Sequence, residues 1–235
     1  HVHDPVDIFF GVKEIISENG IFILEFPHLL NIYKELQFDN VFHEHIGYHS
    51  LKSIIDICGI VDMKVINVKK IDSQGGSLRI FITNNKSKRT SNNVNKILKE
   101  EHDSKIYKKI SWMKFSLRLK SNINKLEKLF KTLRKQNKKI AVYGASGKGQ
   151  TLLQLINQSG KYFDHVYDKS KLKEGLYTPG THILIRNPSN IYKDKPDFIF
   201  VCTWNLIDEI MIEHKKYILE GGKFIIPFPN PKILK

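Results

Sequence analysis

Three histidines, a carboxylate and a phenol lie within residues 42–51, which read Phe-His-Glu-His-Ile-Gly-Tyr-His-Ser-Leu. The segment follows an apolar, strand-like run at residues 20–26 and precedes a helix-like run at residues 51–57. Open α/β sheets bind ligands on loops just past the ends of their strands, so the sequence predicts that this loop forms half of an active site. Histidine titrates near neutral pH, which suits a general base.

A second loop with chemical potential lies at residues 144–151, between a strand-like run at 140–143 and a helix-like run at 151–158. It contains Gly-Ala-Ser-Gly-Lys-Gly. Glycine lets the backbone approach phosphate oxygens, and a helix N-terminus presents unpaired N–H groups to them. Lys148 can add a point charge. Asp168 follows Gly144 by about 24 positions, near the spacing at which a strand-end carboxylate meets a ribose hydroxyl.

The glycine turn matches no standard fingerprint fully. Its order is Gly-x-x-Gly-x-Gly, whereas the dinucleotide fingerprint is Gly-x-Gly-x-x-Gly. A P-loop would place Ser or Thr after Lys148, where Gly149 stands. The glycines could therefore serve only a tight strand-to-helix turn, and this alternative stays open.

The elements that position these loops predict an α/β fold in two parts. In the first part Asp4 and Pro5 open a helix, and residue Gly59 caps another. The continuous apolar run at 21–26 predicts a strand buried on both faces of a parallel sheet. The predicted elements are helices at 5–16 and 51–58, strands at 21–26, 61–69 and 77–83, and a loop at 84–95. Their order is that of the second half of a doubly wound domain.

Residues 97–136 predict one long or broken connecting helix, apolar on one side and basic on the other. A second α/β unit begins at Lys139. Its predicted strands are 140–143, 165–168, 198–202 and 223–227, and its predicted helices are 151–158 and 205–220. We therefore expect domain limits at 1–90, 91–137 and 138–235.

The bulk composition indicates a soluble globular protein, with 41% hydrophobic and 26% charged residues in 235. The sequence contains no run of about 18 apolar residues, so no membrane-spanning helix is predicted. The first residues do not resemble a signal peptide and lack an initiator Met, so we expect the chain to begin inside a longer protein. Cys58 and Cys202 lie in apolar segments, which predicts buried, reduced thiols and a cytoplasmic location.

The net charge of +14 is concentrated between residues 105 and 139, where about 13 Lys and Arg face one acid, Glu127. Such a patch could bind nucleic acid or a membrane surface. Base-reading motifs are missing, so a solvated helix face is the preferred interpretation and nucleic acid is not an expected partner. The field could also attract an anionic substrate such as a nucleotide sugar.

Taken together, six stretches in a fixed order resemble the nucleotide-sugar C-methyltransferases that act on deoxysugars. Members of that family have a zinc-binding N-terminal domain, a central S-adenosylmethionine domain and a Rossmann-like C-terminal domain. The matching stretches are residues 1–4, 38–51, 143–151, 179–183, 204–210 and 221–225. The resemblance implies that this chain is the C-terminal part of such an enzyme: the second half of a class I methyltransferase sheet, a connecting helix and the Rossmann-like domain. The zinc cysteines and the glycine-rich cofactor loop would precede His1.

The resemblance also implies roles for single residues. The family's acid/base histidine falls on His45 and its neighbouring carboxylate on Glu44, while His1 and Tyr48 could hydrogen-bond the sugar or the developing oxyanion. The family's tyrosine two positions before the glutamate is Phe42 here, which removes a phenol from the site.

The implied reaction is methyl transfer from S-adenosylmethionine to a sugar carbon next to a keto group, with His45 removing a proton from that carbon. No metal is needed for this chemistry. The residues expected to bind the nucleotide sugar are Gly144, Ala145, Ser146, Gly147, Lys148, Gly149, Thr151, Asp168, Trp204 and Asn205.

Several alternatives remain open on the sequence. Residues 144–168 could serve an NAD(P)-dependent sugar reductase or epimerase, or the chain could be a non-catalytic nucleotide-sugar-binding remnant. The histidines could ligate a metal or be ordinary surface and core residues, and Trp204 could be a core residue.

Overall fold

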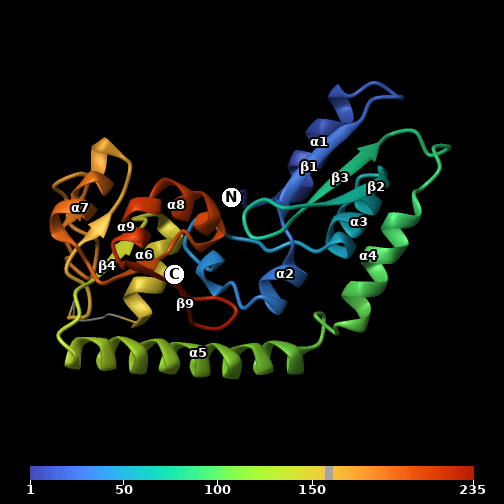
Figure 1. The fold of residues 1–235 in the computed structure, drawn as a ribbon. Helices are drawn as coiled ribbons and strands as arrows, with labels where there is room; N and C mark the ends of the chain where they lie inside the picture. Colours follow the sequence, from blue (N-terminus) through green and yellow to red (C-terminus); the bar gives the residue numbers. More distant parts are fainter. Residues whose placement is uncertain (157–160) are drawn as a thin grey trace. The chain divides into compact units, whose positions relative to one another are not determined.

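The computed structural model describes residues 1–156 and 161–235 (Figure 1). It has two compact units. Unit 1 comprises His1–Gln37 and His43–Phe115, and unit 2 comprises Phe38–Phe42 and Ser116–Lys235. The short segment Phe38–Phe42 therefore belongs with the C-terminal residues although unit 1 flanks it in sequence. The domain limits expected after residues 90 and 137 stay predictions.

Unit 1 contains a three-stranded sheet in the order β1-β3-β2. The central strand β3 is antiparallel to both neighbours, so β1 and β2 run parallel to each other. The elements are α1 (Pro5–Ile15), β1 (Phe22–Pro27), α2 (Leu29–Lys34), α3 (Leu51–Ile60), β2 (Lys64–Ile71), β3 (Ser77–Thr83), α4 (Asn92–Asp103) and the start of α5 (Lys109–Lys135). The mixed α/β class predicted from the sequence is confirmed.

Local sequence signals account for the helix starts of unit 1. The Asp4 carboxylate accepts the N–H of Val6 at 2.8 Å ahead of Pro5, as predicted. At α3 the side chains of Ser50 and Ser53 form a reciprocal capping box. Ser91 caps α4 and starts this helix inside the stretch predicted as a loop.

Three predictions for unit 1 are wrong. Gly59 does not cap α3, because the helix continues to Ile60 and Asp62 takes the left-handed conformation beyond it, with φ of 56°. The strand β1 is not buried on both faces: its burial alternates, and Ile23 is 55% exposed. The predicted parallel pairing of this strand is also wrong, because β1 pairs with β3 alone among the described residues and is antiparallel to it. One face of β1 is left exposed, so its apolar run does not mark burial on both faces.

Unit 2 contains a six-stranded sheet in the order β6-β5-β4-β7-β8-β9, parallel except for the last pair. Its strands are β4 (Ile140–Tyr143), β5 (Val166–Tyr167), β6 (Ile185–Arg186), β7 (Phe198–Val201), β8 (Lys223–Ile226) and β9 (Lys232–Leu234). Its helices are the rest of α5, α6 (Gly147–Ile156), α7 (Ile191–Asp194), α8 (Ile207–Glu213) and α9 (Lys215–Leu219), with 3₁₀ turns at Phe38–Asn40, Lys171–Lys173, Pro188–Asn190 and Trp204–Leu206. The central strands β4 and β7 are buried at every position, which explains their continuous apolar sequence.

The connecting helix is broken into α4 and α5, one of the two forms predicted. The helix predicted at 151–158 begins earlier, at Gly147, so the glycine turn is shorter than expected; Asn157 and Gln158 lie outside the described residues. The helix predicted at 205–220 is divided at His214. Short elements such as β6 and β9 were not predicted, because two or three residues give no readable period.

Cys58 and Cys202 are free and buried, as predicted. None of the helices in residues 1–156 and 161–235 is both long and apolar enough to span a membrane.

Candidate functional site

The structure brings three of the predicted catalytic side chains of unit 1 together. The ring of His45 lies 5.0 Å from the ring of His1 and 6.2 Å from that of Tyr48, measured between centroids. These side chains come from the chain start and from the loop that leads into α3. Burial raises the pKa of Tyr48, so its phenol keeps its proton at neutral pH and can donate a hydrogen bond.

Glu44, the predicted partner of His45, has a largely solvent-exposed side chain. Its carboxylate Oε1 is 3.9 Å from Nε2 of His43, and both side chains are largely exposed. A screened contact of this kind contributes little energy. The role of Glu44 beside His45 therefore stays a prediction.

The buried carboxylate of Glu101 on α4 anchors this loop, and it was not among the residues predicted from the sequence. Its Oε1 accepts the backbone N–H of Leu51 at 2.7 Å and lies 2.7 Å from His28 Nε2. Its Oε2 accepts the N–H of Lys52 at 3.2 Å and the phenol O–H of Tyr107. The carboxylate thus occupies the N-terminus of α3, where the helix dipole favours negative charge.

Burial alone would raise the pKa of Glu101, but these hydrogen bonds outweigh it and hold the pKa below its ordinary value. His28 is itself buried at the end of β1, and the N–H of Leu29 donates to the carbonyl of His49 at 3.0 Å. The C-terminal end of the histidine-containing loop is therefore fixed at two points, His49 to the start of α2 and Leu51 to α4. A sequence signal exists: Glu101 falls four positions after Ile97 on the apolar face of α4, where a carboxylate is unexpected.

In unit 2 the glycine turn lies at the carboxyl end of β4 and is braced by Asp168, which follows β5. Oδ2 of Asp168 accepts the N–H of Ala145 at 2.7 Å, and Oδ1 accepts the N–H of Ser170 at 2.9 Å. Lys173 Nζ links the glycine turn to Asp168: it lies 3.0 Å from the carbonyl oxygen of Ala145 and 3.5 Å from Oδ2 of Asp168. In this structure the Asp168 carboxylate holds the turn in shape.

Glycine is required at two points of this turn. Gly144 has φ of 98°, and a Cβ there would lie 2.7 Å from Cγ2 of Thr203. A Cβ at Gly149 would lie 3.0 Å from Cβ of Cys202, so α6 packs closely on the end of β7. The hydroxyl of Ser146 accepts the N–H of Gly149 at 3.2 Å and caps the helix.

The segment Phe38–Phe42 packs on α6 and adds a buried carboxylate to this edge of the unit 2 sheet. Oδ2 of Asp39 accepts the indole N–H of Trp204 at 2.9 Å. Burial raises the pKa of Asp39, opposed by that hydrogen bond and by the charge of Lys148. Burial in turn lowers the pKa of Lys148, opposed by Asp39. Asp39 lies in one of the stretches that resemble the family, but it was not among the predicted site residues.

The remaining predicted residues of unit 2 lie around this edge. Thr151 Oγ1 is 3.5 Å from the carbonyl of Val41, and the ring of Phe42 would contact a Cβ placed on Gly147. Trp204 packs edge-on against Phe228 at 5.7 Å between centroids, whereas Asn205 is exposed. Trp204 thus combines a core contact with a polar one.

As for a metal, no group of three or more His, Cys, Asp or Glu side chains is arranged to hold one in the described part of the chain. The side chains around His45 are the rings of His1 and Tyr48, which do not form a group of three metal-ligating residues with it.

Comparison with known proteins identifies the family. Residues 72–229 match the family described as C-methyltransferase C-terminal domain. The whole chain is 29% identical, over 235 residues, to C-methyltransferase NovU of Streptomyces niveus, and the alignment covers 56% of NovU. The chain therefore spans about half the length of this curated relative. The resemblance to C-methyltransferases is confirmed, and the chain belongs to the C-methyltransferase C-terminal domain family.

Proposed function

We propose that this chain provides the proton-abstracting and substrate-binding parts of an S-adenosylmethionine-dependent C-methyltransferase that acts on a keto-deoxysugar of a nucleotide sugar. The observation that carries the proposal is the cluster of the His1, His45 and Tyr48 rings in a chain of this family. A carbon next to a ketone becomes nucleophilic only after it loses a proton, so the reaction needs a base that works near neutral pH.

In the proposed mechanism His45 accepts that proton through its imidazole. Negative charge then moves to the keto oxygen, which needs a hydrogen-bond donor. Tyr48 is suited to this task because its raised pKa keeps the phenol protonated. His1, 5.0 Å from His45 between ring centroids, is a second candidate donor.

In unit 2 the nucleotide diphosphate is proposed to bind at the glycine turn. The N–H groups of Gly147 and Lys148 begin α6, and a helix start of this kind favours anions. Lys148 adds a cation whose charged form a diphosphate would stabilise. Asp168 keeps the turn in shape, and Trp204, Asn205 and Thr151 complete the proposed substrate contacts.

S-adenosylmethionine would supply the methyl group. In unit 1, left-handed glycines are found at Gly75 and Gly76, in the β2–β3 hairpin. Within the described residues of that unit, no glycine turn joins a strand to a helix. The described residues of unit 1 do not by themselves fit as the binding site of that cofactor, so the mechanism uses only what the chain's own residues can do.

Calorimetry of the 235-residue chain tests the substrate half of the proposal. We expect dTDP to bind, the variant Lys148→Gln to bind about tenfold more weakly because a charge-assisted contact is lost, and the exposed control Lys215→Gln to bind as the unsubstituted chain does. Absence of dTDP binding would contradict the proposal. Binding of NAD(P) in a parallel titration would favour the reductase or epimerase alternative, although Asp168 already accepts two backbone N–H groups.

A further inference from the structure

Unit 2 has a cavity of about 590 Å³ at the edge of its sheet opposite to the glycine turn. Lys139 directly precedes β4, Asp164 and His165 precede β5, and residues 193–196 precede β7. Since these strands are parallel, the cavity lies at their amino ends. The turn at Gly144 follows β4, so the cavity is separate from the proposed nucleotide site. Its volume is in the range of small-molecule sites.

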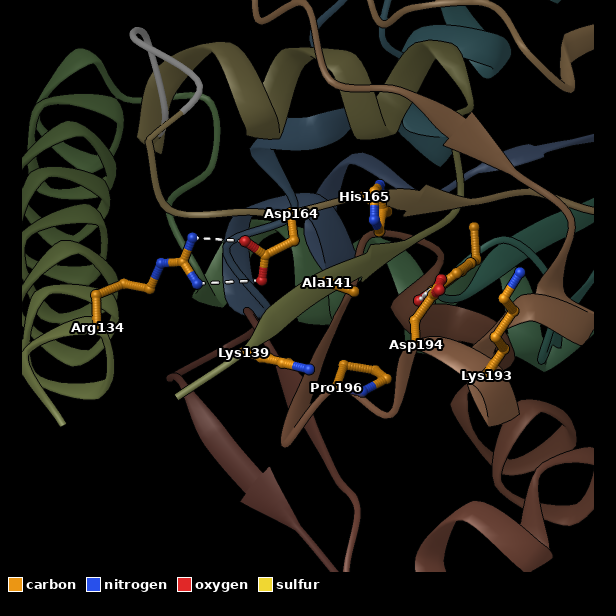
Figure 2. A pocket seen from close by; sticks show the side chains of 9 residues that line it. Arg134, Lys139, Ala141, Asp164, His165, Lys193, Asp194 and Pro196 are labelled. Carbon is orange, nitrogen blue, oxygen red and sulfur yellow. Dashed lines mark hydrogen bonds and ion pairs between the residues drawn. The ribbon is translucent and has the colours of Figure 1, made fainter. Parts of the chain in front are cut away.

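The side chains around the cavity are mostly charged. Figure 2 shows the Arg134–Asp164 pair on one side, Lys193 and Asp194 on the other, and Lys139 and His165 between them. The full lining is Arg134, Lys139, Ala141, Asp164, His165, Tyr167, Lys193, Asp194 and Pro196.

Both carboxylates of the lining are already neutralised by protein groups. Asp164 is held by Arg134 through two hydrogen bonds, of 2.7 and 3.1 Å. Asp194 accepts from Arg186 at 2.8 Å and from the phenol of Tyr167 at 2.9 Å. They therefore leave little negative charge for the lysines of the cavity.

The two lysines of the lining carry the surplus charge. Lys193 makes no ion pair among residues 1–156 and 161–235, and it is exposed. The charge of Lys139 helps to lower the pKa of Asp197, but that carboxylate is shared: it accepts from Lys138 at 3.0 Å and from the backbone N–H of Lys139 at 2.8 Å. Lys193 thus borders the cavity without an ion-pair partner in the described residues, and Lys139 has only a carboxylate that it shares with Lys138.

His165 has a ring N–H group that can donate a hydrogen bond. Its Nε2 lies 3.3 Å from Nη1 of Arg186, and a guanidinium can only donate, so Nε2 is the acceptor. The proton of a neutral His165 must then be on Nδ1. Nδ1 is buried and has no hydrogen-bond partner within the described residues. A buried N–H without an acceptor is costly, and a turn of the His165 ring toward the cavity would bring it within reach of a ligand oxygen.

We propose that this cavity binds a small molecule bearing a phosphate group. A phosphate dianion suits the unpaired charge of Lys193 and the partly compensated charge of Lys139, and its oxygens can accept the ammonium protons of both lysines and the Nδ1–H of His165. The site is independent of the C-methyltransferase reaction proposed above.

Nitrogen-15 NMR of the histidine rings in the 235-residue chain tests this, with inorganic phosphate as the probe at constant ionic strength. The His165 signals, assigned with His165→Gln, should show a protonated Nδ1 and should shift saturably on addition of phosphate. The double variant Lys139→Gln/Lys193→Gln should weaken this binding by about tenfold or more. The matched control Lys171→Gln/Lys215→Gln removes two exposed lysines of unit 2 away from the cavity and should not change it.

Four results would overturn the proposal: no saturable shift at His165, equal binding by the double variant, equal weakening in the lysine control, or the same affinity for acetate as for phosphate. Lys148→Gln separates this site from the glycine turn. It should leave the His165 shifts unchanged even if dTDP binding is lost or never existed.

Discussion

The indole N–H of Trp204 donates a 2.9 Å hydrogen bond to the carboxylate of Asp39, 165 positions earlier in the sequence. The Asp39 side chain is buried, with 1% of the residue exposed. The contact joins the segment Phe38–Phe42 to the 3₁₀ turn that follows β7 and so helps to build the carboxyl edge of the unit 2 sheet. Burial nevertheless raises the pKa of Asp39 above its ordinary 3.8, because the contact and Lys148 only partly compensate for lost hydration.

The first prediction concerns this pair. Trp204→Phe keeps an aromatic ring but removes the donor, and we expect a loss of unfolding free energy of about 1–3 kcal/mol, measured by urea unfolding followed by circular dichroism. Since the folded-state pKa of Asp39 is raised, its ionisation opposes folding, and stability should rise as pH falls through the window just above 3.8. Asp39→Asn should remove that dependence, whereas Asp208→Asn, at an exposed position, should not. An unchanged pH profile in Asp39→Asn would contradict the assignment.

For Glu101 we expect stability to change with pH in the opposite direction to that expected for Asp39. Its folded-state pKa is held below the ordinary 4.5, so it stabilises the folded protein above that pH, and the contribution is lost as pH falls through the lower, folded-state value. We expect Glu101→Ala to cost about 3–5 kcal/mol at neutral pH, because several buried donors lose their acceptor, and to cost progressively less in acid. The measurement is unfolding free energy against pH.

Glu100→Ala is the matched control for Glu101, one position earlier on α4. Its carboxylate pairs with Lys70 at 2.6 Å on the surface, and such pairs contribute about 0–1 kcal/mol. Equal effects of the two substitutions would show that the buried network around Glu101 does not anchor α3.

The catalytic assignment predicts a separation of binding from turnover. In an active protein that contains this chain, His45→Asn should abolish methyl transfer while nucleotide-sugar affinity survives, because asparagine cannot serve as the base. His43→Asn, which changes a side chain that is 86% exposed, should keep near-normal turnover. The measurements are steady-state rates and calorimetric affinities for both variants. Turnover near normal in His45→Asn would remove the base from the mechanism.

The sequence predicted those elements whose signals are local. Asp4 and Pro5 mark the start of α1, and the apolar runs of β4 and β7 indicate buried central strands, because caps and continuous burial act within a few residues. Gly59 misled the prediction: an isolated glycine near a helix end can cap the helix or lie within it, and here tertiary packing keeps α3 helical to Ile60.

The sequence could not predict the contacts between distant positions that shape the candidate sites. Glu101 meets His28 across 73 positions, and Asp39 meets Trp204 across 165. Composition and periodicity contain no pairing information at such separations. The loop residues His45 and Tyr48 were accessible because the chemistry is local and the family resemblance named them; the carboxylates that hold the framework were not.

The last prediction tests whether the glycine turn has a required shape. Gly144→Ala adds a methyl group 2.7 Å from Thr203 Cγ2 at a backbone φ of 98°, so we expect destabilisation of about 1–3 kcal/mol and weaker dTDP binding. Gly11→Ala is the control: it lies inside α1 with no atom within 4 Å of the new methyl group, and it should stabilise by up to about 1 kcal/mol. Unfolding free energies and dTDP affinities of both variants provide the comparison. If Gly144→Ala lost stability but kept full dTDP affinity, the turn would be a structural bend only, and the diphosphate would have to bind elsewhere on unit 2.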